Sequence, residues 1–135
     1  MTTLYSPKGK KTSTQSITER VKTFDDACEV LGLNDVQVGV KGLDDDTKSI
    51  EAYAKLTIIA RALNEGWTPD WSDSDQYKYT VRFYHKSGFG LSYDDCGHWN
   101  SSTGVSSRLC FPSRDNAEYC FETFKDLYED YLLIG

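Results

Sequence analysis

The sequence predicts a single α+β domain over residues 16–135, in which an antiparallel sheet of three to four strands is covered by two longer helices, 48–65 and 114–133. Two segments repeat apolar residues at helical spacing, while the region between them alternates with a period of two. The strands cluster together instead of alternating with helices, which is typical of α+β proteins. A length of 135 residues is that of one ordinary domain able to bury a core.

The N-terminal elements are predicted to be short. Residues 1–15 are rich in Lys, Thr and Ser and predict a disordered basic arm. Ser16 and Glu19 have the spacing of a capping box and predict a short helical turn. Thr23, followed by Asp25 and Asp26, predicts the start of a second helix over 24–31, which Gly32 is expected to end. The alternation in residues 36–40 then predicts a short strand.

The helix at 48–65 has the strongest amphipathic pattern in the first half of the chain. We expect Asp46 or Thr47 to cap it and Gly66 to end it. Its apolar stripe comprises Ile50, Tyr53, Ala54, Leu56, Ile59, Ala60 and Leu63.

A β-hairpin follows, with a tight turn at Ser87-Gly88 and a second strand over 89–93. The face of the first strand expected to meet the core carries Tyr77, Tyr79, Val81, Phe83 and His85. The opposite face carries Lys78, Thr80, Arg82, Tyr84 and Lys86. A polar loop is predicted over 94–104, a third strand over 105–111, and a final helix over 114–133 capped by Ser113.

Charge and composition exclude several functions. Residues 1–22 carry five basic side chains and one acidic side chain, whereas the remaining 113 residues carry ten basic and twenty acidic ones, for a net charge of −6. An acidic body disfavours nucleic acid as a partner. Without an apolar span or a secretory leader in the sequence, we expect no membrane interaction, a cytoplasmic location and four reduced thiols.

Clusters with the chemistry of a metal or catalytic site lack the necessary spacing. Cys96 and His98, with Cys110 and Cys120, do not form the two close pairs of a zinc site. The aspartates near residues 44–46 and 70–75 do not have the frame of a calcium loop. We therefore predict no catalytic residue, no metal ligand and no cofactor.

Aromatic side chains are the best candidates for a binding surface. Trp67 and Trp71 flank Pro69 in the loop between a helix and the hairpin, and Tyr84 and Trp99 complete the set of candidate binding residues. Two alternatives stay open for the tryptophans: they form a contact surface, or they fold back over the edge of the core. The hairpin segment 86–93 loosely resembles the aromatic strand of RNA-binding sheets, with a displaced basic residue and Leu91 in place of an aromatic.

Two segments carry a family resemblance. The run LNEGWTPDW at 63–71 and the run SRLCF at 107–111, followed by Ala117-Glu118-Tyr119, are similar to a group of small uncharacterised proteins of phages and integrated mobile elements in Bacteroidetes gut bacteria. The resemblance covers residues 16–133 and implies a phage-derived protein in the bacterial cytoplasm. It implies no chemistry.

These observations favour a non-catalytic binding or accessory protein that acts through protein contacts. The first alternative is a single-stranded nucleic-acid binder that uses the basic arm and the sheet aromatics. The second is a metal-dependent or hydrolytic enzyme. The sequence indicates neither a particular partner nor an oligomeric state.

Overall fold

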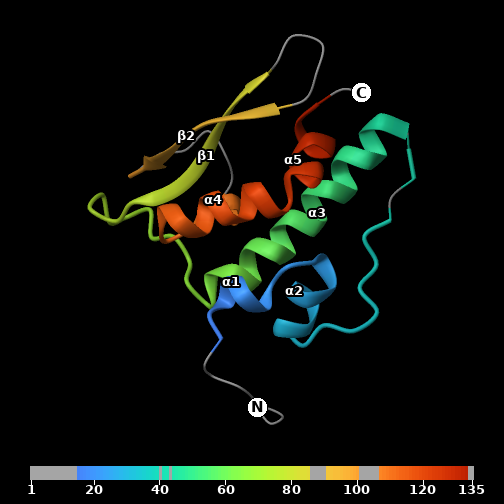
Figure 1. Cartoon of the computed structure of the whole chain (residues 1–135), viewed down its shortest axis with the longest axis horizontal. Coiled ribbons are helices and arrows are strands. Elements are labelled where there is room, and N and C mark those ends of the chain that lie inside the picture. The colour runs from blue at the N-terminus through green and yellow to red at the C-terminus, as the bar shows by residue number, and fades with distance from the viewer. Residues whose placement is uncertain (1–14, 40, 43, 86–90, 101–106, 134–135) are drawn as a thin grey trace.

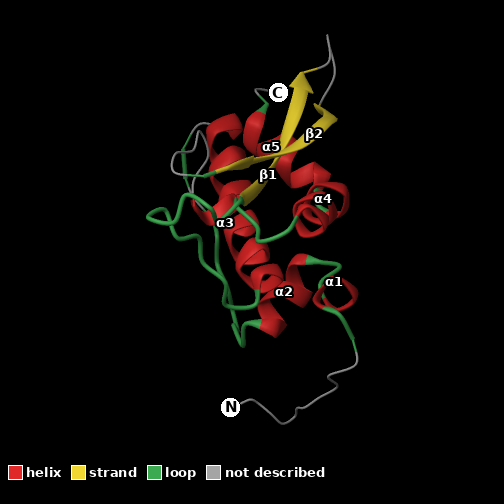
Figure 2. Ribbon diagram, turned by 90° about the vertical axis from the view of Figure 1, so that its left-hand side faces the viewer, coloured by secondary structure: helices red, strands yellow, loops and turns green. Residues whose placement is uncertain are grey.

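The computed structural model describes residues 15–39, 41–42, 44–85, 91–100 and 107–133. Within them, five α-helices and a two-stranded sheet follow one another in the order α1, α2, α3, β1, β2, α4, α5, which confirms the α+β class. The hairpin lies at one end of the molecule beside α4, and α1 and α2 lie at the other end, with α3 running between them (Figures 1 and 2).

The first two helices begin where their capping residues predict. In α1 (Ile17–Arg20) the Ser16 side chain accepts from the Glu19 N–H, and the Glu19 carboxylate accepts from the Ser16 N–H. Thr23 and Asp26 form the same capping box at α2 (Phe24–Val30). Gly32 then takes a φ of +70°, a left-handed conformation that favours glycine.

Helix α3 (Asp44–Asn64) is the centre of the core. Leu56, Ile59, Ala60 and Leu63 of the predicted stripe are fully buried, whereas Ile50 is 51% exposed. The helix begins at Asp44, so the expectation that Asp46 or Thr47 would cap it is wrong. Thr47 lies in the first turn, where its hydroxyl is buried and has no hydrogen-bond partner among the described residues.

The sheet is smaller than predicted. Strands β1 (Lys78–His85) and β2 (Leu91–Trp99) pair antiparallel, with Lys78 opposite Trp99 and a bulge after Arg82. The antiparallel pairing of the predicted hairpin is confirmed, and its predicted turn at Ser87-Gly88 lies outside the described residues. Strand β2 continues through the first part of the predicted polar loop. The expected three to four strands are not present in the described residues.

Neither of the other two predicted strands forms a ladder in the described residues. Residues 107–109 form a 3-10 helix, so the described part of the predicted third strand is reduced to a single antiparallel bridge between Phe111 and Tyr79, and residues 105–106 lie outside the described residues. Residues 36–39 are irregular, and residue 40 of that predicted strand lies outside the described residues. Period-two alternation does not by itself make a strand, because a strand also needs a neighbouring backbone with which to pair over several residues.

The two faces of β1 differ from the expectation. Val81 does pack into the core, but Tyr77 is 47% exposed, and Lys78 and Thr80 of the opposite face are buried. The loop before β1 lies over that opposite face, as the hydrogen bond from the Lys78 ammonium to the Asp73 carbonyl at 2.8 Å shows. Both faces of the strand are therefore covered near its start.

The predicted C-terminal helix is two helices. Phe124, with φ −117° and ψ 32°, separates α4 (Arg114–Thr123) from α5 (Lys125–Leu132). Ser113 caps α4 as expected, its side chain accepting from the Asn116 N–H. Helix α4 contacts both strands, whereas α5 packs along α3 (Figure 1). Because α3 packs mainly against α2 and α5, the prediction that both long helices cover the sheet is wrong.

Apolar side chains of all five helices and of β1 form one buried cluster. Phe111, between the 3-10 helix and α4, belongs to it and is 1% exposed. Among the helices that the structure describes, none combines the length and the apolar character needed to cross a lipid bilayer.

Candidate functional site

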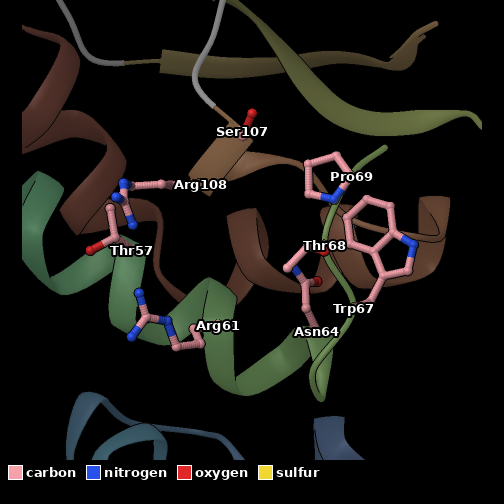
Figure 3. Close-up of a pocket in the computed structure, with 8 residues that line it drawn as sticks. All are labelled: Thr57, Arg61, Asn64, Trp67, Thr68, Pro69, Ser107 and Arg108. Atoms are coloured by element: carbon pink, nitrogen blue, oxygen red, sulfur yellow. The ribbon is translucent and has the colours of Figure 1, made fainter. Parts of the chain in front are cut away.

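A cavity of about 400 Å³ opens beside the C-terminal end of α3 (Figure 3). Its volume is within the range of roughly 300–1,000 Å³ typical of ligand pockets. Three segments line it: Thr57, Arg61 and Asn64 from α3, Trp67, Thr68 and Pro69 from the loop after that helix, and Ser107 and Arg108 from the 3-10 helix.

The end of α3 fixes the walls of this cavity relative to one another. Glu65 and Gly66 both have positive φ, +51° and +89°, so the chain turns sharply and the Trp67 N–H donates to the Asn64 carbonyl at 2.9 Å. The Asn64 side-chain amide donates to the Cys110 carbonyl at 2.9 Å. These bonds join the end of α3 to the loop that follows it, residues 65–77, here named the tryptophan loop, and to the segment after the 3-10 helix.

Two guanidinium groups give the cavity positive charge. Arg61 lies in the last turn of α3, where the helix dipole favours a cation, and Arg108 belongs to the 3-10 helix. Both side chains are exposed, and among the described residues no carboxylate forms an ion pair with Arg61. Figure 3 shows the two guanidinium groups on one side of the cavity, with Trp67 and Pro69 on the other side.

Trp71 is joined to the cavity lining through Ser107. Its indole N–H donates to the Ser107 hydroxyl at 2.6 Å, and its ring lies 5.1 Å from the Lys78 ammonium. Trp71 is half-buried and held at both the ring edge and the ring face. These contacts favour a packing role for Trp71, whereas half-buried Trp67 lines the cavity directly.

The Lys78 side chain is fully buried, which is rare for lysine. Its ammonium donates to the carbonyls of Asp73 at 2.8 Å and of Asn100 at 2.6 Å. The Asn100 amide in turn donates to the Ser74 carbonyl at 2.7 Å. Lys78 therefore connects the tryptophan loop to the end of β2.

The same loop is ordered by its own polar side chains. One carboxylate oxygen of Asp70 accepts from the hydroxyl and the N–H of Ser72, at 2.6 and 3.0 Å, and these bonds lower the pKa of Asp70. The Gln76 side chain accepts from the Asp70 N–H at 2.7 Å. The acidic run thus builds a turn rather than a cluster of converging carboxylates.

Two of the four predicted binding residues, Trp67 and Trp71, lie at or beside the cavity. Trp67 lines the cavity, and Trp71 is joined to it through Ser107. Trp99 is the register partner of Lys78, and Tyr84 lies six residues farther along β1, opposite Ser92. The side chains of Tyr84 and Trp99 lie outside the described residues, so their roles stay predictions.

Sequence reasoning missed Arg61, Arg108 and Lys78. Arg61 precedes Asn64 by three residues and therefore shares its helix face, a spacing that could have linked it to the tryptophan loop. Arg108 lies inside the SRLCF run already singled out. No feature of the sequence indicated that Lys78 is buried, because the alternation in the strand places this lysine on the face expected to meet solvent.

Three cysteines whose side chains the structure describes are buried and form no disulfide: Cys28, Cys110 and Cys120. Burial raises the pKa of Cys110 to about 11 and that of Cys120 to about 12, so neither is a reactive thiolate at neutral pH. His98 stacks on exposed Tyr77 with ring centroids 3.9 Å apart. Within the described part of the chain, no three His, Cys, Asp or Glu residues are grouped to hold a metal ion.

Comparison of the chain with protein-family models, with curated proteins and with solved structures gives no match. The function is therefore inferred from the chemistry of the cavity.

Proposed function

We propose that this chain is a non-catalytic binding protein that recognises a protein partner through the cavity beside α3, here named the arginine–tryptophan pocket (Thr57, Arg61, Asn64, Trp67, Thr68, Pro69, Ser107 and Arg108). The observation that carries the proposal is the convergence of two guanidinium groups and an indole on one cavity in an acidic chain. Arginine and tryptophan are the residues most enriched at energetically important interface positions.

The lining of the pocket supports binding rather than catalysis. Its eight residues include no histidine, cysteine, aspartate or glutamate to act as a base or a nucleophile. Two hydroxyl groups of the lining already form hydrogen bonds within the protein. The Thr57 hydroxyl donates to the Ala54 carbonyl at 2.8 Å, and the Ser107 hydroxyl accepts from the Trp71 indole N–H. What the pocket offers a ligand is positive charge, hydrogen-bond donors and an aromatic edge.

The segments that carry the family resemblance supply most of the pocket. Residues 63–71 and 107–111 contribute six of its eight lining residues, all except Thr57 and Arg61. A phage or mobile-element origin and action in a bacterial cytoplasm are part of the proposal. The gene neighbourhood tests this origin: we expect phage or mobile-element genes on either side.

The test of the binding function compares the chain with Arg61→Gln/Arg108→Gln. Fluorescence polarisation measures binding of labelled random hexapeptides that have an acidic residue and a free C-terminus. We expect binding to the unmodified chain and at least a tenfold loss in the double variant, because charged hydrogen bonds contribute about 1.5–3 kcal/mol each. Equal binding by both proteins, or none by either, contradicts the proposal.

The matched control is Arg20→Gln. Arg20 is an exposed arginine in the last turn of α1, so its loss repeats one of the two charge removals, and the helix-dipole effect of losing Arg61, outside the pocket. The control should bind as the unmodified chain does. Thermal unfolding of all three proteins separates a loss of binding from a loss of fold.

The second candidate, a single-stranded nucleic-acid binder, is favoured by one observation. The exposed Tyr77 ring and the His98 ring stack nearly parallel at the start of the sheet, with an angle of 7° between their planes. Such ring pairs can extend a stack of unpaired bases. A labelled oligonucleotide in a salt series tests this function: affinity that falls steeply with salt and is lost in Tyr77→Ala would replace the protein-binding proposal.

A further inference from the structure

We infer that the arginine–tryptophan pocket takes the C-terminal end of a partner protein, with the free α-carboxylate at Arg61 and Arg108 and an apolar last side chain against Trp67 and Pro69. This inference rests on the proposed function and names the ligand chemistry of the same pocket. Three features of the pocket point to it: its two chemically different ends, its size and the charge around it.

The charged end suits a carboxylate. A guanidinium group presents its N–H donors in a planar fork that matches the two oxygens of a carboxylate. Arg61 and Arg108 come from different elements, the last turn of α3 and the 3-10 helix, and line the same side of the cavity (Figure 3). Two donors that approach from separate elements can hold one planar anion from two directions.

The opposite end suits an apolar side chain. Trp67 offers half-buried ring surface, and the Pro69 ring stands beside it in the same wall (Figure 3). The wall is stiff, because Pro69 fixes its own φ and because Trp71, two residues later, is anchored to Ser107 at 2.6 Å. A preorganised wall lowers the entropy lost when a ligand binds.

Size and charge favour a chain end over an internal segment. A volume of about 400 Å³ is near the lower limit of the ligand-pocket range, which suits a terminal residue better than a helix or an extended strand passing through. The chain carries a net charge of −6, so a ligand rich in acidic residues is repelled outside the pocket. A terminal carboxylate brings one negative charge and needs no others.

The experiment uses labelled hexapeptide pools with five random positions and one fixed last residue, each made as the free acid and as the C-terminal amide. For pools ending in Phe or Leu, we expect the amide to bind about 10- to 100-fold more weakly than the acid. Acid pools ending in Gly should bind about tenfold or more weakly than those ending in Phe, because the apolar contact is lost.

Variants assign these effects to the two ends of the pocket. Arg61→Gln should reduce the difference between acid and amide, and Trp67→Ala should reduce the difference between Phe and Gly, while Arg20→Gln changes neither. These differences compare two ligands on one protein, so partial unfolding of a variant does not imitate them.

One result would overturn the inference while the proposed function stands: amide pools that bind as tightly as acid pools yet need the arginines. That result would assign the arginines to an internal acidic side chain of a protein partner. N-acetyl-phenylalanine binding as tightly as the peptides would overturn both the inference and the proposed protein partner, because the ligand would then be a small carboxylic acid. Absence of peptide binding of any kind would refute the proposed function as well.

Discussion

Replacing Lys78 with methionine tests the role of the buried ammonium. Lys78→Met keeps most of the apolar stem and removes the charge that donates to Asp73 and Asn100 and faces the Trp71 ring. The half-buried Asn100 carbonyl loses this donor, which is destabilising by about 1–3 kcal/mol, whereas the Asp73 carbonyl keeps the Gln76 N–H at 3.2 Å. Methionine avoids the desolvation of an ammonium group, which offsets part of this loss. We expect a net fall of roughly 1–2 kcal/mol in the free energy of unfolding.

Urea unfolding followed by tryptophan fluorescence measures this change, and circular dichroism on the same samples checks that unfolding is two-state. The control is Lys48→Met, since Lys48 is an exposed lysine of α3 whose 3.7 Å ion pair with Asp130 should contribute at most about 1 kcal/mol. A Lys78→Met protein within about 0.5 kcal/mol of the unmodified chain would refute the reasoning. It would mean that the tryptophan loop does not depend on this lysine.

Four further predictions concern stability and the thiols. Phe121→Ala and Phe124→Ala should each destabilise the chain by about 3–5 kcal/mol in urea melts, because both side chains are buried; a loss below about 1 kcal/mol for both would contradict the packing. Gly66→Ala should lower stability by about 1 kcal/mol in the same assay, since φ is +89° there, and no loss would mean that the turn relaxes. Burial raises the pKa values of Cys110 and Cys120 above 9.0, to about 11 and about 12, so the neutral thiols stabilise the fold below pH 9. That contribution is lost as the pH rises above 9, up to about 11 for Cys110 and about 12 for Cys120, by at most about 1.4 kcal/mol per pH unit for each thiol. The free energy of unfolding measured across this range should fall, and a flat profile would contradict the burial. Thiol titration of denatured, unreduced protein should find four free thiols, and two or fewer would refute the expectation of a reducing compartment.

Local signals in the sequence predicted where helices start better than they predicted which elements pack against one another. Ser16, Thr23 and Ser113 cap helices as expected, because a capping hydrogen bond depends on a few neighbouring residues. The break at Phe124 has no such local mark, since the helical spacing of apolar residues continues through it. The break follows from tertiary packing, in which α4 contacts the sheet and α5 contacts α3.

Long-range packing also explains what was missed in the sheet and the site. Alternation places Lys78 on the outer face of β1, and nothing local indicates that the loop before the strand covers that face. For the site, Trp67 was predicted from its residue type and loop position. Arg61 and Arg108 are 47 positions apart in the sequence and meet only when the 3-10 helix packs on α3.

The packing of α5 along α3 has a consequence for synthesis on the ribosome. Helix α3 ends at residue 64 and α5 begins at residue 125, so 60 residues, 65 through 124, are made between them. At about 5–20 residues per second this takes roughly 3–12 s, far longer than the formation of a helix. During that interval the nascent chain exposes the apolar face of α3 that α5 later covers, and we expect chaperones to bind there until α5 emerges from the ribosome.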